Sequence, residues 1–422
     1  MSRYFTVKKL GDHWFFIDPD GNPFYSLGVD CVVCYIGQSK NRIIEKYGGD
    51  RDWFKKWASQ KLKDLNDMGF NTLGAWHDKY YWSNNVPKTI ELKMTKYSKK
   101  VNHVWGVGFP DVFDDSFESS VYTVMTEFFD RETGNPLKDN RSVIGYFTDN
   151  ELHWWGRVGE WGKDDQGAGR NSTALVDDYI RLPHDASGKK AWVSFLRNKH
   201  KTIEELNRVW QSEYSSFEDL LWAKQYRAEN SAFIADKTEF LEIIAEKYFS
   251  TTSSILNEYA PGQLNLGCRL VGVSAPDVVL KVMAKYVDVA SLNFYSMKFP
   301  ADYLDHVYEL TQKPIMITEF SFCTGSDYGF VRNTNGAQNV IVKNQTRRAE
   351  AYEAFVTDAF NRPYMVGTHW FALYDYHSEG EGLRGNYGLY DRYDNPWQEF
   401  IAGVKRTNLM ILDQMKNVKD SE

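Results

Sequence analysis

Cysteine is scarce in this chain of 422 residues, which has only four: Cys31, Cys34, Cys268 and Cys323. Four cysteines are too few for a disulfide framework. Cys31 and Cys34 form a C-x-x-C pair, but no second pair follows that would complete a zinc site. We therefore interpret this pair as buried structural thiols.

Long apolar runs are also missing. No stretch of eighteen apolar residues occurs, so no membrane span is predicted. Residues 1–9 lack the apolar segment of a secretory signal. We expect a protein that is cytoplasmic, or one that is secreted or periplasmic after removal of its signal. The sequence leaves this choice open, and it leaves the oligomeric state open as well.

Basic charge is not in excess, because the net charge is −7 and no basic patch or tail is visible. Nucleic acid is therefore not expected as a partner. The chain also has no G-x-S-x-G, H-E-x-x-H, Walker or dinucleotide-binding motif. No ligand cluster with suitable spacing stands out, so we expect neither a metal nor a cofactor.

Aromatic residues, by contrast, are plentiful: they make up 16% of the chain, with 14 Trp and 26 Tyr. Such residues fill cores. In a polar, acidic protein they also suit sugar binding, because the C–H face of a pyranose ring stacks on an aromatic ring while its hydroxyls are hydrogen-bonded.

Apolar, strand-like runs recur along the chain, with helical patterns between most of them. Eight alternating units predict an α/β fold of the (β/α)8 TIM-barrel type. We expect residues 1–422 to form one catalytic domain, in which residues 1–23 are an N-terminal hairpin. Residues 152–259 are too long for one crossover and predict an extended loop and helical insertion at the barrel mouth, after the fourth strand. The expected strands are 24–30, 70–76, a run near 104–109, 143–149, 264–269, 287–293, 314–318 and 364–370.

Two of these runs end on a glutamate. The fourth stops at Asn150 and Glu151, and the seventh stops at Glu319. The carboxyl ends of barrel strands form the reactive face, so both carboxylates are expected at one cleft. Paired carboxylates are what glycoside hydrolysis requires. Asn150 is placed to hydrogen-bond a sugar hydroxyl. A single glutamate after a strand can instead cap a helix or pair with an arginine.

This arrangement resembles the clan A glycoside hydrolases, which are retaining barrels. The resemblance implies that Glu151 is the acid/base and Glu319 the nucleophile. Asn293 and Tyr295 match the Asn-x-Tyr that follows the sixth strand, which implies a hydrogen bond from Tyr295 to Glu319. Two further residues match positions of the clan that contact the sugar: Trp370 as an aromatic platform and His77 as a hydroxyl contact. The alternatives are core packing for Trp370, backbone-satisfied burial for Tyr295 and a structural role for His77.

Within the clan, the chain is most similar to the β-agarases of glycoside hydrolase family 50. The matching stretches are residues 14–32, 146–155, 317–322 and 367–397. Segments 321–324 and 374–384 depart from that family's pattern, which leaves related galactans open as substrates. Four more residues are candidates for substrate contact, with packing, solvent exposure or a salt bridge as the alternatives: Trp154, Arg269, His377 and Arg384. For Arg269 the partner is either a substrate hydroxyl or sulfate, or an acidic neighbour.

The sequence thus predicts a retaining β-glycoside hydrolase that cleaves β-galactosidic linkages of an algal galactan such as agarose or porphyran, or of its oligosaccharides. A covalent glycosyl-enzyme intermediate is implied. Two alternatives remain. The first is a clan A hydrolase of another β-glycan, such as a glucan, a mannan or a β-galactoside. The second is a non-catalytic carbohydrate-binding barrel.

Overall fold

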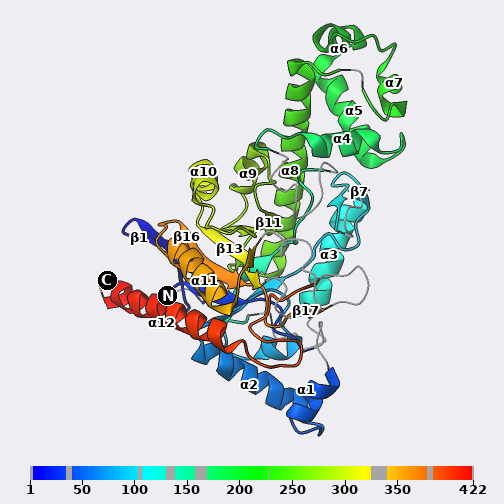
Figure 1. Ribbon diagram of the computed structural model, residues 1–422. Helices are drawn as coiled ribbons and strands as arrows, with labels where there is room; N and C mark the ends of the chain where they lie inside the picture. The colour runs from blue at the N-terminus through cyan, green and yellow to red at the C-terminus, as the bar shows by residue number, and fades with distance from the viewer. Residues whose placement is uncertain are drawn as a thin grey trace.

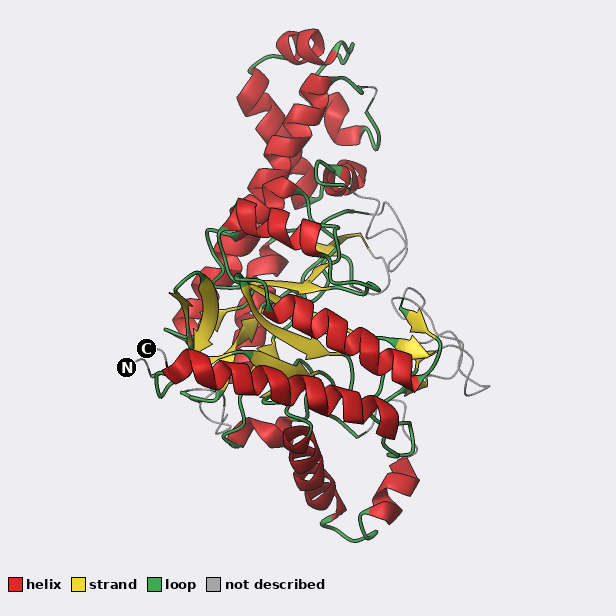
Figure 2. Ribbon diagram, turned by 60° about the vertical axis from the view of Figure 1, so that its left-hand side comes forward, coloured by secondary structure: helices red, strands yellow, loops and turns green. Residues whose placement is uncertain are grey.

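The computed structural model describes residues 3–34, 40–102, 107–129, 137, 139–156, 169–226, 228–324, 340–377 and 384–420. It is an α/β fold built around a nine-stranded parallel sheet (Figures 1 and 2). The strand order is β10-β9-β6-β5-β4-β16-β13-β12-β11. The strands are β4 (Ser26–Val29), β5 (Thr72–Leu73), β6 (Lys88–Glu91), β9 (Val143–Phe147), β10 (Leu264–Asn265), β11 (Leu270–Val271), β12 (Ala290–Asn293), β13 (Ile315–Phe320) and β16 (Met365–Trp370).

The two end strands of this order belong to one short segment, 264–271. Its first part, β10, pairs with β9, and its last part, β11, pairs with β12. Backbone bonds between these paired regions continue the contact: the amide of Thr148 donates to Gly267, and the amide of Asp288 donates to Asn265. A single stretch of chain is therefore hydrogen-bonded to neighbours on both of its sides.

The third strand differs from the one expected. The strand between β5 and β9 is β6, not a run near 104–109. Within that run, residues 103–106 lie outside the described residues, and β8 (Phe109–Pro110) pairs antiparallel with β7 (Lys100–Asn102) in a separate ribbon. The reason is composition: β6 has the sequence Lys-Thr-Ile-Glu, and because three of its four residues are polar, a pattern of apolar runs does not predict it.

A small antiparallel sheet precedes β4. It consists of β1 (Thr6–Leu10), β2 (His13–Ile17) and β3 (Pro23–Phe24), with a turn at 18–22 closed by the Asp18 side chain. Phe5 and Phe16 of this region pack in a buried cluster with side chains from the parallel strands, among them Ile144, Leu266 and Met316. The sheet is thereby anchored to the core by apolar burial.

Helices cover the outside of the parallel sheet. These are α1 (Lys40–Lys46), α2 (Trp53–Asp67), the 3-10 helix η1 (Lys79–Ser83), α3 (Asp115–Phe129), α9 (Asp277–Met283), α10 (Ala301–Thr311), α11 (Gln345–Phe360) and α12 (Gln398–Asp420). α11 and α12 lie against each other along one flank, and the two chain ends lie close together (Figures 1 and 2). Short two-stranded ribbons, β14–β15 (Cys323–Thr324 with Ile341–Val342) and β17–β18 (Tyr376–His377 with Arg384–Gly385), complete the fold.

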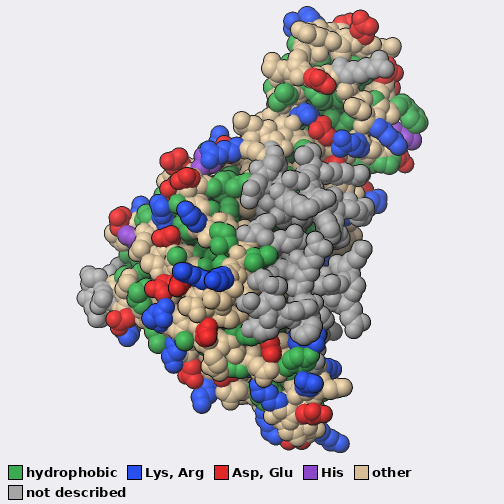
Figure 3. Space-filling view, in the orientation of Figure 1, with side chains coloured by type: hydrophobic (Ala, Val, Ile, Leu, Met, Phe, Trp, Pro, Cys, Tyr) green, Lys and Arg blue, Asp and Glu red, His purple; other side chains and the backbone are tan. Residues whose placement is uncertain are grey.

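A group of helices between β9 and β10 stands away from the sheet (Figure 1). It comprises α4 (Ala174–Arg181), α5 (Ser187–His200), α6 (Ile203–Trp210), α7 (Phe217–Trp222) and the first half of the long α8 (Ser231–Tyr259). Side-chain caps at Thr202, Ser216 and Asn230 set the starts of α6, α7 and α8. The second half of α8 returns to the sheet and packs on α3 and α9. Charges of both signs are interspersed over the visible face of the molecule (Figure 3).

Candidate active site

The carboxyl ends of several parallel strands carry residues with left-handed backbone. Cys31, Trp76, Glu151 and Arg269 have φ values of 55°, 58°, 54° and 49°. Cys31, Trp76 and Glu151 follow β4, β5 and β9, and Arg269 lies between β10 and β11. Such backbone costs a non-glycine residue on the order of 1 kcal/mol and persists where surrounding contacts enforce it. Strain of this kind collects at functional sites, and here it turns four side chains at one edge of the sheet.

Glu151 and Glu319 lie side by side, bridged by one amide. The Nδ2 atom of Asn293 donates to Glu151 Oε1 at 2.9 Å and to Glu319 Oε1 at 2.8 Å. The two oxygens are therefore less than about 6 Å apart, close to the roughly 5–5.5 Å carboxyl spacing of retaining glycosidases. An irregularity in the β12–β13 pairing places Asn293 directly opposite Glu319. Thr318 Oγ1 donates to the amide oxygen of Asn293, which fixes the orientation of the amide.

Glu319 accepts two further hydrogen bonds. Tyr295 Oη donates to its Oε2 at 2.6 Å, and Arg269 Nη2 donates to its Oε1 at 2.5 Å. Burial raises the pKa of Glu319 to about 8; Arg269 opposes the rise, Glu151 and Asp30 add to it, and Tyr295 opposes it. The implied hydrogen bond from Tyr295 to Glu319 is present and favours the ionised carboxylate, whereas burial favours the neutral form. Arg269 pairs with Asp30 and Glu319, and Glu151 lies beside Glu319, so repulsion among the three carboxylates favours keeping one proton on the group.

Arg269 is fully buried and paired with acids. Its guanidinium contacts Asp30 Oδ2 at 3.2 Å as well as Glu319, and its Nε donates to Asn150 Oδ1 at 2.7 Å. It also lies over the ring of Trp76, 4.5 Å from the centroid. Of the two alternatives for Arg269, the structure contains the acidic pairing. The residue positions Glu319 and Asn150 and does not line the cavity.

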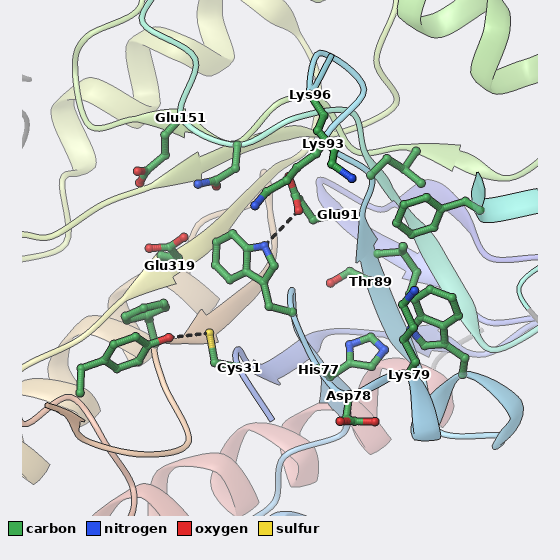
Figure 4. Close-up of a pocket in the computed structure, with 18 of the residues that line it drawn as sticks. Cys31, His77, Asp78, Lys79, Thr89, Glu91, Lys93, Lys96, Glu151 and Glu319 are labelled. Carbon is green, nitrogen blue, oxygen red and sulfur yellow. Dashed lines mark hydrogen bonds between the residues drawn. The ribbon is translucent and has the colours of Figure 1, made fainter. Parts of the chain in front are cut away.

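A cavity of about 910 Å³ opens above the two glutamates (Figure 4). Asn150, Glu151, Tyr295 and Glu319 line one part of it, and His77 lines another. The Nδ1 atom of His77 bonds to the Gly74 carbonyl at 2.7 Å, and burial lowers the pKa of this histidine to about 4. The remaining lining residues are Cys31, Trp76, Asp78, Lys79, Trp82, Thr89, Ile90, Glu91, Leu92, Lys93, Lys96, Glu127, Phe128, Phe371, Tyr376 and Tyr387.

Two aromatic residues expected at the sugar lie in the core instead. Trp370 is fully buried, donates to the Tyr387 carbonyl at 3.0 Å and packs against Phe320 and Phe400. Because successive strand residues face opposite sides, it is the next residue, Phe371, that reaches the cavity. Trp154 is likewise buried, stacked on Phe249 and away from the cavity lining.

His377 and Arg384, the other two candidates for substrate contact, face each other in the β17–β18 ribbon. Their side chains lie outside the part of the chain that the structure describes.

Three residues of the site were not predicted from the sequence: Trp76 and Glu91 line the cavity, and Asp30 is buried beside Arg269. Asp30, Trp76 and Glu91 all lie at the ends of parallel strands, so the logic that selected Glu151 and Glu319 applies to them too. Asp30 directly precedes the C-x-x-C pair, and Glu91 ends a strand that the apolar pattern does not predict. Among the described residues, no cluster of three or more His, Cys, Asp or Glu is arranged to hold a metal ion. Within the same ranges, every helix is too short or too polar to cross a bilayer.

No protein-family model matches the chain. Two curated proteins from Vibrio sp. (strain JT0107) do: β-agarase B, 29% identical over 388 residues and 89% of this chain, and β-agarase A, 28% identical over 481 residues and 96% of this chain. The matched regions are 38% and 46% of those proteins, so this chain spans less than half the length of either relative.

Solved structures show the same fold. They include an exo-β-agarase (TM-score 0.85, 21% identity), PfGH50B (0.84, 23%) and the agarase AgWH50C (0.82, 24%). Each match covers 98% of this chain and 66% of the solved chain. The resemblance to family 50 β-agarases that the sequence motifs indicate is confirmed: the chain is a homologue of β-agarases across most of its length and shares the fold of solved family 50 proteins.

Proposed function

We propose that this protein is a retaining β-glycoside hydrolase that cleaves β-galactosidic linkages of an agarose-type galactan. The single observation that carries the proposal is the carboxylate pair, Glu151 and Glu319, bridged by Asn293 at the floor of a sugar-sized cavity. The relatives named β-agarases support the substrate class. Their similarity extends over the region that contains both glutamates.

We infer that the sheet closes into a (β/α)8 barrel. Segment 264–271 supports this inference, because it bonds to β9 on one side and to β12 on the other and thus acts as the fifth strand of a continuous ring. Closure brings the ends of β9 and β13 to one mouth. The helices at 174–259 would then be an insertion between the fourth and fifth strands, within one domain.

The proposed reaction is a double displacement. In the first half, the Glu319 carboxylate attacks the anomeric carbon while the Glu151 carboxyl gives its proton to the departing glycosidic oxygen. In the second half, Glu151 takes a proton from water, the hydroxide oxygen bonds to the anomeric carbon, and the bond to Glu319 breaks. Both glutamates return to their starting protonation states.

The surrounding residues support these roles. Asn293 binds both carboxylates and sets their spacing, while Arg269 and Tyr295 stabilise the charge on Glu319 each time it is released. The oxygen of Asn150 accepts from Arg269 Nε, which leaves its amide nitrogen to donate to a sugar hydroxyl in the cavity.

The test uses two isosteric variants, Glu319→Gln and Glu151→Gln, on a panel of agarose, porphyran, carrageenan and their oligosaccharides. We expect the wild type to release products from the agarose-type chain and Glu319→Gln to lose at least 10³-fold in rate with its fold unchanged. Nuclear magnetic resonance should show the β-anomer as the first product. Glu127→Gln is the matched control, because this exposed carboxylate lies at the cavity rim, paired with Lys96. Inversion at the anomeric carbon, or near-normal turnover by Glu319→Gln, would refute the proposal.

A further inference from the structure

A second part of the cavity contains polar atoms that lack partners. Thr89 Oγ1, Glu91 Oε1 and His77 Nε2 are buried and have no hydrogen-bond partner among the residues that the structure describes. The exposed fractions of Thr89, Glu91 and His77 are 0%, 8% and 6%, and all three residues line the cavity. Buried polar groups are normally satisfied, because leaving one unpaired is costly. Three such atoms at one cavity wall therefore indicate a ligand that supplies the missing bonds.

The fold places these atoms together. Thr89 and Glu91 are two residues apart on β6, so their side chains point to the same face of the sheet. His77 follows β5, the neighbouring strand. Figure 4 shows Thr89 and His77 on the side of the pocket away from Glu151 and Glu319, with Glu91 between them and the catalytic pair.

Trp76 joins this group to the catalytic pair. Its Nε1 donates to Glu91 Oε2 at 3.0 Å, and its ring lies against Arg269, which holds Glu319. One indole thus separates the two polar groups, and an indole is comparable in width to one sugar ring. Trp82 and Phe128 add further aromatic surface to the same part of the cavity.

The charges at the cavity rim differ from those at its base. Lys79, Lys93 and Lys96 are exposed at the rim; Lys79 lies over the Trp82 ring and Lys96 pairs with Glu127. The base holds the Glu91 carboxyl. Burial raises the pKa of Glu91 to about 7, with Lys93 lowering it, Asp149 raising it, and Arg269 and Trp76 lowering it. The carboxylate form of Glu91 is favoured above this pKa.

We propose that Thr89, Glu91 and His77 form a subsite for an uncharged, hydroxyl-bearing sugar unit adjoining the one at the catalytic pair, and that Glu91 excludes a sulfate ester from it. The inference rests on the proposed function. A carboxylate accepts hydrogen bonds from sugar hydroxyls, whereas a sulfate offers only acceptor oxygens and a negative charge. Specificity would follow from repulsion as well as from attraction.

The test compares a neutral agarose oligosaccharide with a sulfated porphyran oligosaccharide of equal length at pH 8. The wild type should prefer the neutral chain. Glu91→Gln keeps the shape but removes the charge, so the ratio of kcat/KM for neutral over sulfated chain should fall about tenfold. Glu309→Gln, an exposed carboxylate on α10 outside the cavity lining, should leave the ratio unchanged.

Thr89→Val provides a second, independent readout. It replaces an unpaired buried hydroxyl by a methyl group of the same size, so Tm should stay equal or rise. KM for the neutral chain should rise several-fold while kcat changes little.

Three patterns of results separate the possible failures. If the wild type cleaves neither chain, or if Glu319→Gln is active, the proposed function itself fails. If the wild type is active and Glu319→Gln is not, but Glu91→Gln keeps the wild-type ratio, only the subsite is refuted. A Thr89→Val variant that loses stability but keeps its KM would assign the hydroxyl to a trapped water and would also overturn the subsite.

Discussion

Removing the phenolic hydroxyl of Tyr295 tests how the site keeps Glu319 reactive. Tyr295 Oη donates to Glu319 Oε2 at 2.6 Å, in a half-buried position. A hydrogen bond to a charged group is worth about 1.5–3 kcal/mol. One pKa unit corresponds to about 1.36 kcal/mol, so Tyr295→Phe should raise the pKa of Glu319 by roughly 1–2 units.

The sign follows from the reaction. Glu319 must be ionised to attack, so the acidic limb of the kcat/KM profile reports its titration as part of the coupled pair. Burial already raises the pKa of Glu319 to about 8. In Tyr295→Phe the limb should move to higher pH by the same 1–2 units, and activity at pH 6 should fall about 10–100-fold.

The assay is the pH dependence of kcat/KM on a galactan oligosaccharide for the wild type and the variant. Tyr376→Phe is the matched control, because Tyr376 lines the same cavity but donates to Cys31 Sγ at 3.0 Å rather than to Glu319. Its acidic limb should stay in place. An unmoved limb in Tyr295→Phe would show that the phenol does not stabilise the Glu319 anion, and the assignment of Tyr295 would be lost.

Three more predictions follow from particular contacts. Arg269→Lys removes the guanidinium that pairs with both Asp30 and Glu319. We expect the free energy of unfolding, measured by chemical denaturation, to fall by about 3–5 kcal/mol and kcat to fall at least 100-fold. Near-wild-type values would contradict the buried pairing. Trp370→Ala, in the core, should lower the free energy of unfolding by about 3–5 kcal/mol. Phe371→Ala, at the cavity, should mainly raise KM. The reverse pattern would indicate that Trp370 is the aromatic platform for the sugar. Burial lowers the pKa of Lys88 to about 7, so the wild type loses stability as pH falls from about 10.5 to 7. The Tm of Lys88→Met relative to that of the wild type should therefore rise as the pH falls through this window. A Tm difference that stays constant across pH would refute this.

The sequence indicated the main strands because burial on both faces forces an apolar run. β9 and β13 have uninterrupted apolar or small residues until they reach the cavity, where a carboxylate becomes tolerable. This switch from apolar to acidic marks Glu151 and Glu319 without any knowledge of the structure. The Asn-x-Tyr at 293–295 was equally readable, because it depends on local order in the chain.

The tertiary structure decided features that depend on which face a residue occupies. Lys88 to Glu91 form the third strand although only Ile90 is apolar, because Thr89 and Glu91 face a polar cavity rather than a core. Phe371, and not the predicted Trp370, lines the cavity, because a shift of one residue turns a side chain to the opposite face.

The partners of Arg269 show the same division. Its place near the end of a strand was visible in the sequence, but Asp30 and Glu319 lie 239 and 50 residues away. The sequence by itself therefore determined which side chains stand at strand ends, because local burial dictates residue type. Only the tertiary structure decided which of them meet, because pairing along the carboxyl edge of the parallel sheet depends on strand order and register.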